Sequence, residues 1–178
     1  MGTKLYLCIA LTSFMLWNCG NQKNENVDRS KDKLSAQQDD GTMILKLEKA
    51  GYYNDDMNPS NNTAEWNVDI LKPGRFKVWL SSATSDTTDL SYKTNVRVNF
   101  PDCQLVGIPV CNKVVQKSED VSYPYTADSY MGSVYIPERG EYHIQVVSEK
   151  AISKAAEEKL TELDKTKLLA VILTPVSR

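Results

Sequence analysis

The strongest structural signal in this sequence is a pair of short runs in which apolar and polar residues alternate. Residues 66–70 form the first run and residues 75–81 the second. A period of two is typical of a strand that buries one face. Between the runs lie Pro73, whose ring sets φ, and Gly74, which tolerates positive φ, so this segment has the composition of a turn. The sequence therefore predicts a β-hairpin over residues 66–81.

Further short strands are expected along the rest of the chain. The same alternation, or a short apolar run, is found in residues 43–47, 94–100, 114–115 and 168–174. A second hairpin is predicted over residues 133–148, around a turn at residues 138–140. Polar segments at residues 51–63 and 81–91, and the tyrosine-rich residues 123–130, are expected to be loops. Many short strands separated by turn residues indicate an all-β sandwich or barrel.

One segment breaks this rhythm. Residues 150–165 carry apolar side chains at helical spacing, among them Ile152, Ala155, Ala156, Leu160 and Leu163. This spacing predicts one short amphipathic helix just before the last strand.

The order of these motifs resembles the galactose-binding-like jelly-roll sandwiches. The resemblance lies in residues 64–70 (AEWNVDI), 72–78 (KPGRFKV), 132–142 (GSVYIPERGEY) and 169–175 (LAVILTP). Carbohydrate-binding modules and the accessory β-sandwich of bacterial α-fucosidases are similar in these features. The resemblance implies a jelly-roll β-sandwich, and it leaves the ligand open because such folds host many functions. Some relatives bind calcium through one acidic residue in the first strand and one near the last. Glu48 is a candidate for the first and the second is not placed, so a structural calcium ion is left open.

The N-terminus has the pattern of an export signal. A basic residue, Lys4, precedes the apolar residues 5–17, and a polar tract follows Cys19. Residues 16–20 resemble a lipobox, although Trp17 and Asn18 stand where small residues are usual. The pattern predicts a signal peptide at residues 1–18, a flexible tether at 19–41 and a β-sandwich domain at 42–178.

Cys19 is the predicted lipidation site. A membrane-spanning helix needs roughly 20 apolar residues, more than this run supplies. Acyl chains such as palmitate on Cys19 would hold the protein on a bacterial membrane without a span. The expected location is therefore the outer membrane or cell envelope, with a lipid anchor. Ordinary secretion with a free Cys19 is the alternative.

The composition bounds the partners and the cysteine chemistry. The formal net charge is −2, which gives no electrostatic reason for binding nucleic acid. The chain has four cysteines. Cys8 lies in the signal and Cys19 at its end, so two cysteines remain, Cys103 and Cys111. In an exported protein they are predicted to pair as a disulfide. The alternative is two reduced cysteines that pack as small apolar groups.

Carbohydrate binding would need exposed aromatic rings beside polar side chains. Trp66 shares a face with Val68 and Ile70, so it is expected in the core. Trp79 lies on the opposite face of its run from the apolar residues, which makes it either a sugar platform or a ring covered by a loop. The remaining candidates are tyrosines expected in loops: Tyr52, Tyr53, Tyr123, Tyr125 and Tyr130.

The sequence contains no recognisable catalytic set. His143 is the single histidine and alternates outward from its neighbours. A lone histidine cannot supply a zinc site or pair with a reactive cysteine. The sequence therefore predicts a non-enzymatic, membrane-tethered carbohydrate-binding lipoprotein that needs no cofactor. The alternative is a structural or assembly lipoprotein that binds another envelope protein.

Overall fold

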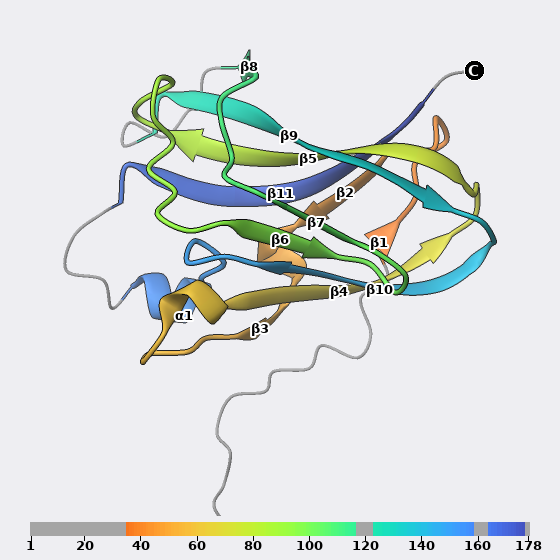
Figure 1. Ribbon diagram of the computed structural model, residues 1–178, viewed down its shortest axis with the longest axis horizontal. Coiled ribbons are helices and arrows are strands. Elements are labelled where there is room, and N and C mark those ends of the chain that lie inside the picture. The colour runs from red at the N-terminus through yellow and green to blue at the C-terminus, as the bar shows by residue number, and fades with distance from the viewer. Residues whose placement is uncertain (1–34, 117–122, 159–163, 177–178) are drawn as a thin grey trace, which may run out of the picture.

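The computed structural model describes residues 35–116, 123–158 and 164–176, and they form two β-sheets packed face to face (Figure 1). Sheet A has the strand order β1-β4-β10-β6-β7, with β3 also paired to β4; sheet B has the order β2-β11-β5-β9-β8. All neighbouring strands pair antiparallel except β1 and β4. The predicted all-β jelly-roll sandwich is confirmed.

The strands of sheet A are mostly short. They are β1 (Ser35–Ala36), β3 (Gly51–Tyr53), β4 (Thr63–Ile70), β6 (Val96–Asn99), β7 (Gln104–Gly107) and β10 (Gly140–Val147). Sheet B contains β2 (Met43–Lys46), β5 (Gly74–Thr84), β8 (Lys113–Gln116), β9 (Tyr125–Ile136) and β11 (Thr166–Pro175). Two 3-10 turns, η1 (Leu47–Lys49) and η2 (Pro59–Asn61), lie between strands.

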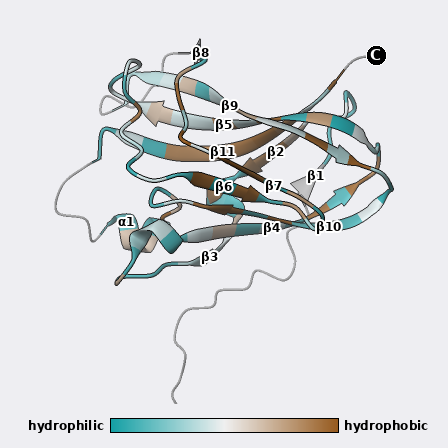
Figure 2. Cartoon of the chain, in the orientation of Figure 1, coloured by the Kyte–Doolittle hydropathy of each residue, from teal (hydrophilic) through white to brown (hydrophobic). Residues whose placement is uncertain are grey.

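The core lies between the sheets and is built by the predicted alternation. Val68 and Ile70 of β4 and Val78 and Leu80 of β5 belong to the same hydrophobic core, and all four are fully buried. Trp66 is also buried, at 3% exposure, and its indole Nε1 donates a hydrogen bond to the carbonyl oxygen of Lys46 at 3.0 Å. The long hydrophobic stretch of β11 is visible in Figure 2.

The two predicted hairpins do not form. β4 pairs with β10 in sheet A, whereas β5 pairs with β9 and β11 in sheet B. The turn at Pro73 and Gly74 therefore carries the chain from one sheet to the other. The turn before Gly140 does the same between β9 and β10. Alternation shows only which side chains face the core; two runs that face each other across a sandwich have the same pattern as two runs that pair.

A true hairpin lies where none was predicted. β6 and β7 pair antiparallel, and the amide of Phe100 donates to the carbonyl oxygen of Cys103 at 2.8 Å. Pro101 and Asp102 occupy the centre of this turn, which suits both residue types.

The predicted loops and helix also need correction. Tyr52 and Tyr53 lie in β3, and Tyr125 and Tyr130 lie in β9, so these four tyrosines are on strands. The helix before the last strand is present as α1 (Lys154–Glu157), it does not include residues 150–153, and residues 159–163 of the predicted helix lie outside the described residues. Its N-terminus is capped by Ser153, whose side chain accepts from the amide of Ala156.

The folded domain starts earlier than residue 42. β1 pairs with Val68 and Asp69 of β4, and the Gln37 side-chain oxygen accepts from the amides of Leu71 and Lys72. Residues 35–41, assigned from sequence to the tether, therefore contact the sandwich. The predicted signal peptide, Cys19 and the rest of the tether lie outside the described residues.

Candidate functional site

The outer face of sheet B carries Trp79 at its centre. Along β5 the residues Phe76, Val78 and Leu80 point into the core, so Trp79 points the other way, as predicted, and is half-buried. Its neighbours across the sheet are Ile172 of β11 and Tyr130 of β9. The central strand of this sheet therefore presents a large ring on the solvent side.

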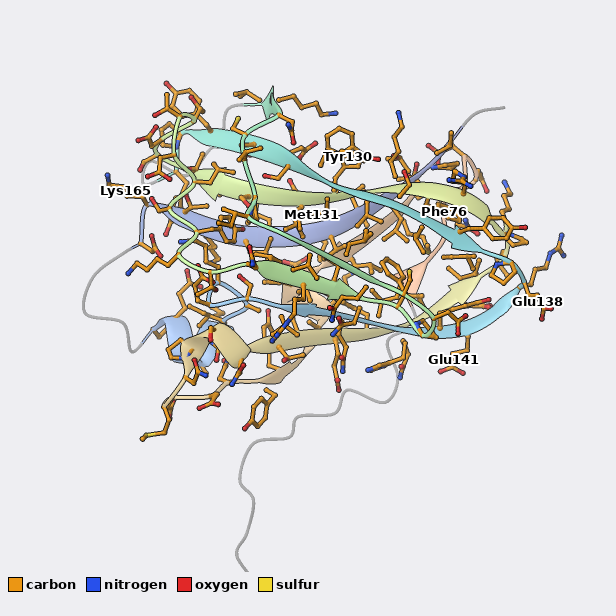
Figure 3. All side chains as sticks on the ribbon, in the orientation of Figure 1. Phe76, Tyr130, Met131, Glu138, Glu141 and Lys165 are labelled. Carbon is orange, nitrogen blue, oxygen red and sulfur yellow. The ribbon has the colours of Figure 1, made fainter. Side chains whose placement is uncertain are left out.

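A β-bulge places Tyr130 beside Trp79. Val78 pairs with Gly132 but Trp79 pairs with Tyr130, which leaves Met131 as the extra residue on β9. A bulge of this kind changes the facing of the residues beyond it. In a regular strand every second residue lies on the same face, so without the bulge an outward Tyr130 would place Val134 and Ile136 outward as well. With the bulge, both of these residues are buried. Figure 3 shows Tyr130 on the side of β9 that faces away from sheet A.

Gly132 permits this bulge. Its φ is +138°, a conformation that residues with a Cβ rarely adopt. A Cβ at this position would also approach Leu105 Cδ2 to 3.1 Å. Both constraints favour glycine here.

The two rings form a small aromatic surface. The ring centroids of Trp79 and Tyr130 are 5.1 Å apart, with an interplanar angle of 54°, which is a favourable tilted contact. Lys113 Nζ lies 5.3 Å from the Trp79 ring centroid. The Tyr130 hydroxyl lies 2.9 Å from Ser133 Oγ, and the backbone amide of Tyr130 donates a hydrogen bond to Asn112 Oδ1 at 2.6 Å. Tyr130 is thus held in place while 44% of it stays exposed.

A buried carboxylate lies next to the rings. The Asp128 side chain is 9% exposed, and its Oδ2 is 3.6 Å from Lys113 Nζ. Its Oδ1 has no hydrogen-bond partner among the described residues. A buried acceptor without a partner is costly. Asp128 therefore has unused capacity to accept a hydrogen bond.

A hollow of about 530 Å³ adjoins these groups on the same face. Asp128, Ser81 and Ile172 line it, together with Ile44 of β2 and Glu48. It combines apolar walls with a few polar groups, which is the usual composition of a small-molecule site.

The other predicted tyrosines do not join this surface. Tyr52 and Tyr123 line a separate cavity of about 350 Å³ beside α1. Burial, with the carboxylates of Glu157 and Glu48 nearby, holds the pKa of Tyr52 well above its ordinary value. The Tyr52 hydroxyl donates to the carbonyl oxygen of Leu47 at 2.7 Å. Tyr53 is 54% exposed on β3, and neither it nor Tyr125 lines this cavity or the hollow beside Trp79.

The residues considered for metal binding and catalysis, Glu48 and His143, lie in different sheets or segments, and only Glu48 reaches the hollow. Glu48 is exposed and pairs with Lys46 at 3.7 Å. Within the described parts of the chain, no group of three metal-ligating side chains comes together. His143 is on sheet A, where its Nδ1 contacts Asn67 Oδ1 at 3.0 Å and its Nε2 lies 3.3 Å from Glu65 Oε2.

The predicted disulfide is not formed. Cys103 is exposed, Cys111 is partly buried, and both are free thiols. Cys103 ends the tight turn between β6 and β7, and β7 then runs away from it for about 13 Å. A disulfide needs Cα atoms within about 7 Å. Four of the seven residues between the two cysteines form this extended strand, which opposes the close approach that a disulfide requires.

Sequence reasoning identified Trp79 and Tyr130 but missed Lys113 and Asp128. Lys113 comes from β8, at the edge of the sheet, and Asp128 was placed in a loop. Only the register of β8 on β9, which pairs Lys113 with Asp128, brings them to Trp79.

Along residues 35–116, 123–158 and 164–176, no helix is long and apolar enough to span a bilayer.

Comparisons with known proteins bear on the fold. No family model matches the chain, and no curated protein matches it. Among solved structures, an α-L-fucosidase from Vibrio sp. strain EJY3 is similar over 80% of this chain and 24% of its own, with 19% identity and a TM-score of 0.61. A GH26-CBM35 β-(1,4)-mannanase from Podospora anserina matches 78% of this chain and 28% of its own, with 10% identity and a TM-score of 0.45. The chain spans about a quarter of the fucosidase, so the likeness concerns one β-sandwich region.

Proposed function

We propose that this protein is a non-catalytic carbohydrate-binding lipoprotein of the bacterial envelope, and that the outer face of sheet B is its binding surface. The observation that carries the proposal is the ring pair of Trp79 and Tyr130 beside a hollow. Aromatic rings bury the apolar face of a sugar, while nearby polar groups bind its hydroxyls.

The polar groups next to the rings suit this role. Asp128 lines the hollow beside the rings, where a carboxylate can accept hydrogen bonds from sugar hydroxyls. Lys113, whose side chain is 57% exposed, supplies hydrogen-bond donors beside this carboxylate. The fold similarity to part of a protein named as an α-L-fucosidase agrees with the proposal. The rings, carboxylate and lysine together form a site that binds and orients a sugar.

The non-catalytic part of the proposal follows from how the titratable groups are distributed. Two carboxylates, Asp128 and Glu48, line the hollow, and each is paired with a lysine, Asp128 with Lys113 and Glu48 with Lys46. Glycoside hydrolysis ordinarily uses two carboxyl groups on either side of the scissile bond. The histidine lies on sheet A, on the other layer of the sandwich. We therefore expect bound glycans to be released unchanged.

The test is a glycan array probed with the purified full chain. The proposal expects binding to a related group of glycans, and no new reducing ends after prolonged incubation with them. Failure to bind any glycan contradicts carbohydrate binding. Release of reducing ends, lost in Asp128→Asn, would instead indicate an enzyme.

A second candidate, a lipoprotein that binds another envelope protein, is favoured by one observation. The chain from β7 to β8 exposes Val106, Ile108, Val110 and Val114, each by at least half. Exposed apolar groups that lie together are typical of protein interfaces. A photo-crosslinking residue at Ile108 that captures one defined envelope protein, when the same residue at Tyr53 does not, would support it.

A further inference from the structure

Two cations share the outer face of sheet B with Trp79. Arg75 and Lys77 precede Trp79 on β5 at alternate positions, so all three side chains leave the same side of the strand. Successive members of this row are separated by about 7 Å. Arg75 and Lys77 are exposed, and no ion pair involving either is found within the described residues.

The strands on either side bring no carboxylate to this row. On β9 the cross-strand partners of Arg75 and Lys77 are Tyr135 and Ser133. On β11 the partner of Lys77 is Thr174. This end of the face is therefore positive, although the whole chain has a net charge of −2.

The nearby acids are already engaged. Asp128 lies on the far side of Trp79 and pairs with Lys113. Asp40 lines a hollow of about 730 Å³ together with Arg75 and Tyr135; its carboxylate accepts hydrogen bonds from Thr42 and forms no ion pair with Arg75 among the described residues. Arg75 and Lys77 thus remain available to an anion that arrives with a ligand.

We propose that the ligand of this face is an acidic glycan, whose carboxylate or sulfate groups contact Arg75 and Lys77 while a sugar ring lies against Trp79 and Tyr130. This inference rests on the proposed carbohydrate binding and adds the chemical class of the ligand. Arg75 offers a planar, bidentate site for an oxyanion, and Lys77 offers a point charge between Arg75 and the rings. Tyr135, which is 64% exposed, extends the aromatic surface beside Arg75.

Matched polysaccharides test the proposal. The full chain is titrated with polygalacturonate and its carboxyl-reduced form, and with λ-carrageenan and its desulfated form. At least one acidic polymer should bind about tenfold more tightly than its neutral counterpart at low salt, since two favourable charge contacts are gained. The preference should fall at 1 M salt, where the screening length is only about 3 Å. Comparison of the two pairs distinguishes carboxylate from sulfate.

Charge variants locate the effect. Arg75→Gln combined with Lys77→Gln should remove the preference for the acidic polymer, with a loss of affinity of about tenfold. The control is Lys49→Gln combined with Lys93→Gln, which removes the same charge from two other exposed residues and should leave the preference intact. Circular dichroism of both double variants checks that the fold is unchanged.

The outcomes separate the two proposals. If neutral polymers, or neutral glycans on the array, bind as tightly as acidic ones, the acidic class is wrong and carbohydrate binding stands. If the control double variant loses the preference as fully as the test variant, net charge and not this row is responsible, and the assignment to Arg75 and Lys77 is wrong. If no glycan binds at all, the proposed function fails and this inference fails with it.

Discussion

The rings of Trp79 and Tyr130 lie 5.1 Å apart on the outer face of sheet B, although the two residues are far apart in sequence. Their contact depends on the bulge at Met131, which shifts the pairing of β9 on β5 by one residue. The candidate site is therefore a consequence of strand register, and changes that disturb the register should affect it.

Gly132→Ala should destabilise the protein by about 1–3 kcal/mol, because alanine is strained at this φ and its Cβ would crowd Leu105. Gly107→Ala is the matched control on the adjacent β7: its φ is not in the unfavourable range, and its Cβ would come no closer than 3.8 Å to Met131. Urea denaturation measures both. Equal stability of the two variants would contradict the account of the bulge.

Trp66→Ala and Trp79→Ala should differ in stability. Trp66 is 3% exposed within the core, so its truncation should cost about 3–5 kcal/mol. Trp79 is half-buried on the outer face, and we expect its truncation to cost less than half as much. Thermal melts of the two variants test this. A similar loss in both would mean that Trp79 is a packing residue.

The thiols of Cys103 and Cys111 should both be free. Partial desolvation of the thiol at the protein surface, with the nearby Asp102 carboxylate, raises the pKa of Cys103. Because the thiolate is the reactive form, alkylation of Cys103 should rise only at a higher pH than for an unperturbed cysteine. Peptide mass spectrometry after alkylation across a pH series measures this. Recovery of the two peptides joined under non-reducing conditions would restore the disulfide predicted from sequence.

Cys19 should carry the lipid. The basic residue, the apolar run and the position of Cys19 at its end motivate this expectation. Metabolic labelling with a fatty-acid analogue should mark the wild-type chain and not Cys19→Ala. Labelling that persists in the variant would show that the anchor lies elsewhere or does not exist.

The facing of side chains could be predicted from sequence, but the pairing of strands could not. Alternation correctly assigned Trp66 to the core and Trp79 to the opposite face, because both follow from a period of two. It gave no information on partners, so β4 and β5 were predicted as a hairpin although they lie in different sheets. The tyrosine-rich residues 123–130 were likewise predicted to be a loop, whereas most of them belong to β9, the strand beside the central strand β5.

The site was predictable only in part for the same reason. Trp79 could be found on its own strand. Its neighbours Tyr130, Asp128 and Lys113 depend on a bulge and on an edge strand whose register is set by tertiary packing. The failure of the disulfide has a related cause, because residues close in sequence are separated when the segment between them is extended.

The most direct test of the account is the affinity of Trp79→Ala for a glycan that the wild-type chain binds, measured by titration calorimetry. Tyr53→Ala is the matched control, since it removes an exposed aromatic ring from sheet A. If the outer face of sheet B is the binding surface, Trp79→Ala should lose about 2 kcal/mol or more of binding free energy, while Tyr53→Ala should bind like the wild type. Unchanged affinity of a folded Trp79→Ala would contradict the central claim and place the sugar elsewhere on the protein.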